Sequence, residues 1–127
     1  MKYNQLGKTG YEISAISFGA SSLGGVFHEI DEHKAIEAVH VALELGINYF
    51  DVAPAYGGTK AETVLGQALN GIPRGSYYLS TKVGKNTSSD GYGVDSFDYS
   101  GDGIRKSLDE SAKRIGVDHF DIVHLHD

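Results

Sequence analysis

Hydrophobic positions along the chain switch repeatedly between helical and strand-like spacing. Ile36, Val39 and Leu43 fall on one face of a helix that Asp31 can cap. The same pattern predicts helices over residues 31–45, 59–70 and 100–115, each followed by a glycine that suits a helix end. Short apolar or aromatic runs predict strands over residues 15–18, 47–51, 77–82 and 120–126.

The remaining segments are rich in turn-forming residues. Residues 2–15 surround the turn Gly7-Lys-Thr-Gly10 and predict a hairpin. The Gly-rich stretch 19–25 is, on spacing alone, a flexible connector, because such a loop is a weak ligand signal. Thr59-Lys-Ala-Glu62 has the pattern of a capping box at the start of the second helix. The polar stretch 83–99 is predicted to be a long loop with a function, such as a lid.

Alternating strands and helices predict an α/β fold with parallel strands and right-handed crossovers. An open doubly wound sheet and a TIM barrel both satisfy this order. No Gly-x-Gly-x-x-Gly follows the first predicted strand, which weakens the dinucleotide-binding version of the open sheet. The length of 127 residues predicts a single domain over residues 1–127.

Composition narrows the function classes. The net charge of −6 argues against a nucleic-acid-binding surface. The absence of cysteine excludes disulfides and cysteine-based metal sites. No apolar run approaches the length of a membrane span, and the first residues lack a secretory-signal pattern. We therefore expect a cytoplasmic protein without nucleic-acid or membrane partners.

Strand parity brings three polar residues to one edge of the predicted sheet. Side chains alternate along a strand, so Asp51, Lys82 and His126 are predicted to point to the same face at the carboxyl ends of their strands. Tyr49 and Ser80 share this face. The apolar residues of the opposite face are predicted to pack against the helices, among them Phe50, Leu79, Val123 and Leu125. Tyr56 follows Asp51 on the next loop. On spacing alone, an interior ion pair between Asp51 and Lys82 beside a core histidine is the favoured explanation of the pattern.

Three motifs resemble those of the aldo-keto reductases. Residues 46–57, Gly-Ile-Asn-Tyr-Phe-Asp-Val-Ala-Pro-Ala-Tyr-Gly, match the family signature Gly-x-x-x-Phe-Asp-Thr-Ala-x-x-Tyr-Gly except at Val52. Ser80-Thr-Lys82 and Asp121-Ile-Val-His-Leu-His126 match two further family motifs. Within this family, the local sequence is most similar to that of a sugar-dehydrogenase branch. The resemblance favours the TIM (β/α)8 barrel, of which this chain would hold the N-terminal hairpin and about four βα units, a half barrel.

The resemblance implies a reaction and a role for each site residue. It implies an NAD(P)-dependent oxidoreductase that interconverts a carbonyl, such as an aldehyde, ketone or lactone-forming sugar, and an alcohol. Tyr56 would be the general acid and base, Lys82 and Asp51 would support it, and His126 would orient the substrate. NADP or NAD would contact Asp51 and the loop Gly19, Ala20 and Ser21, where Ala20 replaces the more usual threonine.

Two alternatives stay open from the sequence. His124 and His126 share a strand face, and with Asp127 nearby they could bind zinc or iron in a metal-dependent hydrolase. A half barrel would also expose strand edges and lack the cofactor phosphate site of the later strands. It would then be a non-catalytic assembly unit that forms a homodimer or pairs with a C-terminal half barrel.

Overall fold

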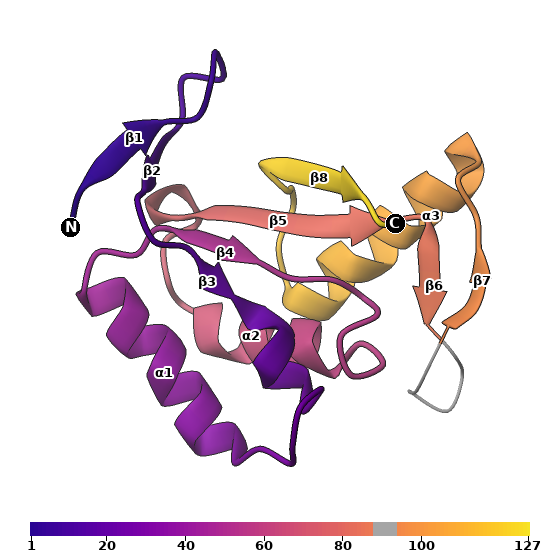
Figure 1. The fold of residues 1–127 in the computed structure, drawn as a ribbon, viewed down its shortest axis with the longest axis horizontal. Helices are drawn as coiled ribbons and strands as arrows, with labels where there is room; N and C mark the ends of the chain where they lie inside the picture. The colour runs from indigo at the N-terminus through magenta and orange to yellow at the C-terminus, as the bar shows by residue number, and fades with distance from the viewer. Residues whose placement is uncertain (88–93) are drawn as a thin grey trace.

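The centre of the molecule is a parallel sheet of four strands in the order β3-β4-β5-β8. In this computed structural model, residues 1–87 and 94–127 are described. The strands are β3 (Phe18–Gly19), β4 (Tyr49–Asp51), β5 (Tyr78–Val83) and β8 (Ile122–Leu125). Helices α1 (Glu32–Glu44), α2 (Lys60–Leu69) and α3 (Gly101–Ile115) lie in the connections between successive strands. Figure 1 shows α1 and α2 together on one side of the sheet.

Helices α1 and α3 begin or end at the caps that the sequence predicts. The Asp31 carboxylate accepts hydrogen bonds from the backbone N–H groups of His33 and Lys34 at 3.0 and 3.4 Å. The Ser100 hydroxyl accepts one from the N–H of Gly103 at 3.0 Å. After α3, Gly116 adopts a positive φ of 81°, which a residue without a Cβ tolerates easily. The predicted bounds of the first and third helices are therefore confirmed to within a residue.

The capping box predicted at Thr59 is wrong. Thr59 stands before α2 with a φ of 73°, and its side chain makes no capping hydrogen bond. The Glu62 carboxylate is instead fully buried. It accepts hydrogen bonds from the Thr81 hydroxyl at 2.9 Å and from Arg114 Nε at 2.7 Å. The buried Thr81 of β5 and the partly buried Arg114 of α3 thus draw this carboxylate into the core, away from the helix terminus.

Segments predicted as loops contain regular structure. The stretch 83–99 carries an antiparallel hairpin of β6 (Lys85–Thr87) and β7 (Val94–Phe97), while residues 88–93 of the predicted lid lie outside the described residues. The Gly-rich stretch forms a 3-10 helix, η1 (Ala20–Gly24). A second one, η2 (Arg74–Ser76), precedes β5. The N-terminal hairpin of β1 (Tyr3–Gln5) and β2 (Glu12–Ser14) is confirmed.

The core lies between the sheet and the helices. Phe50 and Leu79 are fully buried on the helix-facing side of β4 and β5, as parity predicts, and they join a cluster that includes Val39 and Leu65. The same prediction is wrong for the two apolar residues of β8. Val123 is 43% exposed and Leu125 is 68% exposed. Within the described residues β8 is an edge strand, so only one of its sides is joined to a neighbouring strand.

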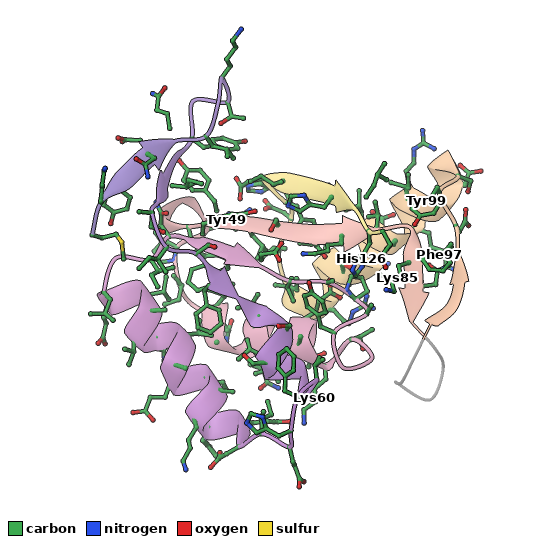
Figure 2. The ribbon with its side chains drawn as sticks, in the orientation of Figure 1. Tyr49, Lys60, Lys85, Phe97, Tyr99 and His126 are labelled. Carbon is green, nitrogen blue, oxygen red and sulfur yellow. The ribbon has the colours of Figure 1, made fainter. Side chains whose placement is uncertain are left out.

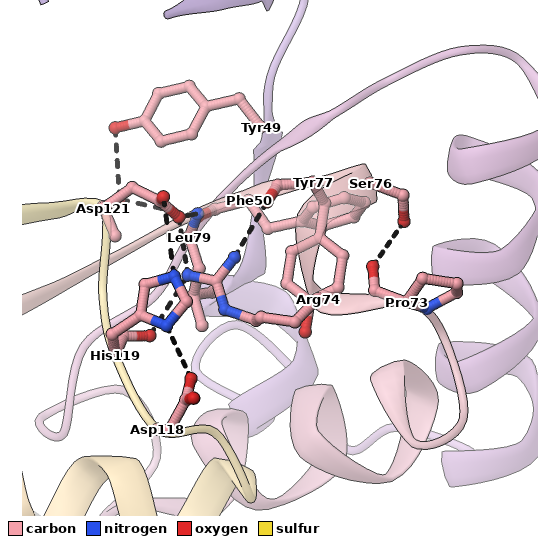
Figure 3. Close-up of polar contacts among 11 residues, drawn as sticks. Tyr49, Phe50, Pro73, Arg74, Ser76, Tyr77, Leu79, Asp118, His119 and Asp121 are labelled. Carbon is pink, nitrogen blue, oxygen red and sulfur yellow. Dashed lines mark hydrogen bonds and ion pairs between the residues drawn. The ribbon is translucent and has the colours of Figure 1, made fainter.

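Asp121 fastens the starts of β5 and β8 to one another. Its carboxylate accepts from Arg74 Nη2 at 2.6 Å and from the backbone N–H of Leu79 at 2.8 Å (Figure 3). Arg74 also donates to the carbonyl oxygens of Tyr77 and His119 at 2.9 and 3.1 Å. This cluster lies at the amino ends of the strands. Asp121 therefore serves the fold, although it begins a motif whose last residue belongs to the candidate site.

Candidate active site

The carboxyl ends of β4 and β5 bring Asp51 and Lys82 together. Lys82 Nζ donates to both carboxylate oxygens of Asp51, at 2.7 Å to Oδ1 and 2.6 Å to Oδ2, and lies 3.3 Å from the carbonyl oxygen of Val52. The two side chains are 14% and 27% exposed, respectively for Lys82 and Asp51. The parity prediction for these residues is therefore matched by a direct, partly buried ion pair.

Tyr56 and His126 complete the group. Lys82 Nζ lies 5.3 Å from the centroid of the Tyr56 ring, a cation–π arrangement. The rings of Tyr56 and His126 meet edge to face, with centroids 6.1 Å apart and planes at 82°. The structure thus gathers all four residues that the sequence singled out, from two strands, the loop after β4 and the residue after β8.

The backbone of His126 is held on both sides. Its N–H donates to the carbonyl oxygen of Val83 at 2.9 Å, and its own carbonyl accepts from the Tyr99 hydroxyl at 2.6 Å. Lys85 and Asp127 form an ion pair beside it. Figure 2 shows Tyr99, Lys85 and His126 close together near the β6–β7 hairpin. The hairpin that the sequence did not predict therefore supports the end of β8.

Burial lowers the pKa of the His126 imidazole, and the Lys85 and Lys82 ammonium groups act in the same direction. The carboxylates of Asp127 and Asp51 act in the opposite direction without reversing the shift. Its Nδ1 is buried without a hydrogen-bond partner in the described part of the chain. An imidazole in this environment is neutral near pH 7. A neutral imidazole can donate an N–H to an uncharged carbonyl oxygen without adding a buried charge.

We expect the His126 ring to titrate below the ordinary value of about 6.5 for an unperturbed histidine. The measurement is a proton NMR titration of the ring, assigned with His126→Gln, and the midpoint should return to the ordinary value in urea. Because folding lowers this pKa, the group's contribution to stability is complete above the unfolded pKa and is lost as the pH falls towards the folded pKa. A folded-state midpoint at or above the ordinary value would contradict the burial argument.

The loop that carries Tyr56 is packed backbone to backbone against η1. A Cβ added to Gly57 would lie 2.0 Å from the carbonyl oxygen of Gly24, and one added to Gly24 would lie 2.6 Å from the carbonyl oxygen of Tyr56. Gly57 also has a φ of 62°. The interpretation of residues 19–25 as a flexible connector is therefore wrong, because the segment is a support for the Tyr56 loop.

Gly57→Ala should destabilise the protein by clearly more than the roughly 1 kcal/mol expected for alanine at a left-handed position alone. The added methyl group meets backbone, which cannot rotate away as a side chain can. Gly71→Ala is the matched control, because Gly71 has a φ of 81° but a Cβ there would meet no described atom within 4 Å. Equal losses of the free energy of unfolding in urea for both variants would show that the contact with Gly24 is unimportant.

Comparison with known proteins shows to which family this chain belongs. The model of the Aldo/keto reductase family matches residues 15–127. The chain belongs to this family. The chain is 44% identical over 124 residues to L-galactose dehydrogenase of Arabidopsis thaliana, which covers 96% of the chain and 37% of that protein. It is 33% identical to D-threo-aldose 1-dehydrogenase of a Pseudomonas species, over 93% of the chain and 41% of that protein.

A solved aldo-keto reductase shares the fold. The holo form of the Bacillus halodurans enzyme superposes with a TM-score of 0.88 at 36% identity, over 99% of this chain and 40% of that one. This confirms the TIM-barrel family rather than the open doubly wound sheet. Residues 1–87 and 94–127 hold four strands of the parallel sheet. The chain spans about two fifths of the length of these relatives. In its described residues, no helix is long and apolar enough to cross a membrane.

The proposed cofactor loop of this aldo/keto reductase lies next to Asp51. Gly19, the last residue of β3, is paired with Asp51 in the sheet register. A Cβ added to Gly19 would meet no described atom within 4 Å, so there is open space at this strand end. Ala20 is fully buried, backbone included, while Ser21 is half-buried. These features fit a flat ring placed over Gly19 beside the Asp51 carboxylate.

Two further residues of the same face contact the ion pair. The Ser80 hydroxyl donates to Asp51 Oδ1 at 2.6 Å, and the Tyr49 hydroxyl donates to Ser80 Oγ at 3.1 Å. The sequence placed both residues on this face by parity but gave no reason to assign them a role. The signal that could have found them is the cross-strand register, because Ser80 lies directly opposite Asp51.

The metal-site alternative gains no support from the aldo/keto reductase structure. His124 Nε2 lies 4.0 Å from Asp51 Oδ1, and the Asp127 carboxylate pairs with Lys85. Across residues 1–87 and 94–127, no group of three or more histidine and acidic side chains is placed to hold a metal ion.

Proposed function

We propose that this protein is an NAD(P)-dependent oxidoreductase that interconverts a carbonyl and an alcohol. The observation that carries the proposal is the Lys82 ammonium group, which lies between the Asp51 carboxylate and the Tyr56 ring at the carboxyl ends of parallel strands. Active sites of TIM barrels lie at this face. Membership of the aldo/keto reductase family gives the arrangement its chemical context.

A nicotinamide cofactor supplies or removes the hydride at the carbonyl carbon. In the reducing direction the chain must give a proton to the oxygen, and the Tyr56 hydroxyl is the donor in this proposal. An ammonium group next to a phenol stabilises the phenolate that remains after proton transfer. The Asp51 carboxylate in turn fixes Lys82 through two hydrogen bonds and balances its charge.

His126 would bind the same oxygen. Its ring faces Tyr56 edge-on, and its lowered pKa keeps it neutral, so it can donate a hydrogen bond without holding a proton that competes with Tyr56. Gly19, Ser21 and Asp51 would contact the nicotinamide end of the cofactor, whereas Ala20, expected from the sequence to join them, is fully buried behind the loop surface. Both NAD and NADP satisfy this arrangement.

Sugars are the proposed substrates. Two of the relatives reported above are named as dehydrogenases of L-galactose and of D-threo-aldoses. We propose oxidation at the anomeric carbon of an aldose to the lactone, in which the hydride would pass to the oxidised nicotinamide and the hydroxyl proton to Tyr56. Reduction of an aldehyde or ketone would use the same groups in the opposite direction, with an alcohol as the product. A cytoplasmic location stays a prediction from the sequence.

The first test is to titrate the complete protein with NADH and with NADPH. Nicotinamide fluorescence reports the binding. Saturable micromolar binding is expected, and turnover with a panel of aldoses should follow. Lys82→Met removes the ammonium group but keeps the length of the side chain, and it should abolish turnover while retaining most cofactor binding. No binding of either nucleotide would contradict the proposed function.

A second candidate follows from the exposed apolar side chains of β8. Val123 and Leu125 lie on an edge strand, and such an edge can pair with another strand. The 127-residue chain by itself could then assemble as a homodimer or with a second half barrel. Sedimentation velocity of this chain distinguishes the cases, because a monomer at micromolar concentration would remove the argument for self-assembly.

A further inference from the structure

We propose that Ser80 and Tyr49 are positioning residues that fix the Asp51 carboxylate, and through it Lys82, for proton transfer. The inference rests on the proposed function of the site. It adds to the four residues singled out by the sequence a chain of two hydroxyl groups that reaches Asp51 from the interior face of the sheet.

The first step is the contact between Ser80 and Asp51. Ser80 is fully buried, and its Oγ lies 2.6 Å from Asp51 Oδ1 but 3.5 Å from the carbonyl oxygen of Phe50. The hydroxyl hydrogen therefore points to the carboxylate. A short hydrogen bond to an ionised acceptor is among the stronger kinds in proteins.

The second step is the orientation of Ser80 itself. A serine hydroxyl can rotate about its C–O bond, so a fixed donor needs a partner that occupies its lone pairs. The Tyr49 hydroxyl donates to Ser80 Oγ at 3.1 Å, which leaves the serine hydrogen free for Asp51. Tyr49 and Ser80 come from neighbouring strands β4 and β5. The chain therefore runs Tyr49 to Ser80 to Asp51.

The third step is the competing partner of Asp51. His124 Nε2, on β8, lies 4.0 Å from Asp51 Oδ1, the oxygen that also accepts from Ser80 and Lys82. Without the serine hydroxyl, this oxygen can turn towards His124. Lys82 would follow the carboxylate and move away from the Tyr56 ring. The geometry thus gives the serine a role in orientation that its burial alone does not require.

The test uses four variants of the complete protein. Ser80→Ala removes the hydroxyl, and Ser80→Thr keeps it. Tyr49→Phe removes the second hydroxyl of the chain. Thr81→Val is the matched control, because Thr81 is also fully buried on β5 but faces the other side and donates to Glu62.

The first readout does not require turnover. A partly buried, hydrogen-bonded ammonium group exchanges its protons slowly, so Lys82 should give a resolved NH₃⁺ signal in proton–nitrogen NMR, assigned by its loss in Lys82→Met. We expect the signal to persist in Ser80→Thr and Thr81→Val and to broaden or vanish in Ser80→Ala. Persistence of an unchanged signal in Ser80→Ala would overturn the proposal.

The second readout separates rate from binding. Ser80→Ala should lower kcat about tenfold and leave KM for the carbonyl and the cofactor within about twofold. Tyr49→Phe should lower kcat by a few-fold. Ser80→Thr should retain most of the kcat that Ser80→Ala loses. Equal losses of kcat in Ser80→Ala and Thr81→Val would show a structural role only and would overturn the proposal. If the unmodified protein neither reduces a carbonyl nor oxidises an aldose, the proposed function fails, while the NMR result still decides whether Ser80 positions Lys82.

Discussion

Tyr56→Phe is expected to lower kcat for carbonyl reduction by about 10²- to 10⁴-fold, the usual contribution of a positioned general acid. The substitution removes one oxygen atom and keeps the ring that contacts Lys82 and His126. The loss should therefore concern proton transfer and not folding. The measurement is the rate of NADH or NADPH consumption, followed by absorbance, with the complete protein.

The control for this variant is Tyr11→Phe. Tyr11 is paired with the ring of Tyr78 near the N-terminal hairpin and takes no part in the candidate site, so kcat should stay within about twofold. Cofactor binding by Tyr56→Phe should also remain within a few-fold of the unmodified protein. Retention of more than a tenth of kcat would show that another group donates the proton.

Glu62→Ala is expected to lower the free energy of unfolding by about 3–5 kcal/mol, the range for removal of one partner of a buried ion pair. The carboxylate is fully buried and accepts from Arg114 and Thr81. Its removal leaves a guanidinium group and a hydroxyl without their acceptor and also opens a cavity. Urea unfolding followed by circular dichroism gives the change.

Two further variants sharpen this prediction. Glu37→Ala is the surface control, because Glu37 is exposed on α1, and it should change stability by less than about 0.5 kcal/mol. Glu62→Ala combined with Arg114→Met should recover part of the loss, because the unpaired charge is then removed as well. A loss below about 1 kcal/mol in Glu62→Ala alone would mean that Arg114 readily finds another partner.

The alternation of side chains along strands was sufficient to predict the pairing of Asp51 with Lys82. Each residue ends or nearly ends a short strand, so the face and the edge were both determined by local pattern. Tyr56 lies on a loop, where no periodicity applies, and only the family motif indicated it. The helix bounds were predictable because Asp31 and Gly116 act through contacts within a few residues.

The predictions that were wrong depend on contacts between distant segments. Glu62 has the spacing of a capping residue, but Arg114 lies 52 positions away in the sequence and its position next to Glu62 is a property of the fold. Val123 and Leu125 have the pattern of buried residues, yet their exposure depends on what lies beside β8. The hairpin within residues 83–99 has few apolar residues, so its pattern resembled a loop.

The opposite faces of β5 have a consequence for folding. Thr81 faces Glu62 and Arg114, and the next residue, Lys82, faces Asp51. A shift of β5 by one position would reverse both, placing an ammonium group in the layer beneath the helices and separating Asp51 from Lys82 and Glu62 from the Thr81 hydroxyl. A sheet with β5 out of register would therefore lose stabilising contacts on both of its faces. Charges that serve the proposed chemistry also widen the energy gap between the native state and its nearest misfolded competitors.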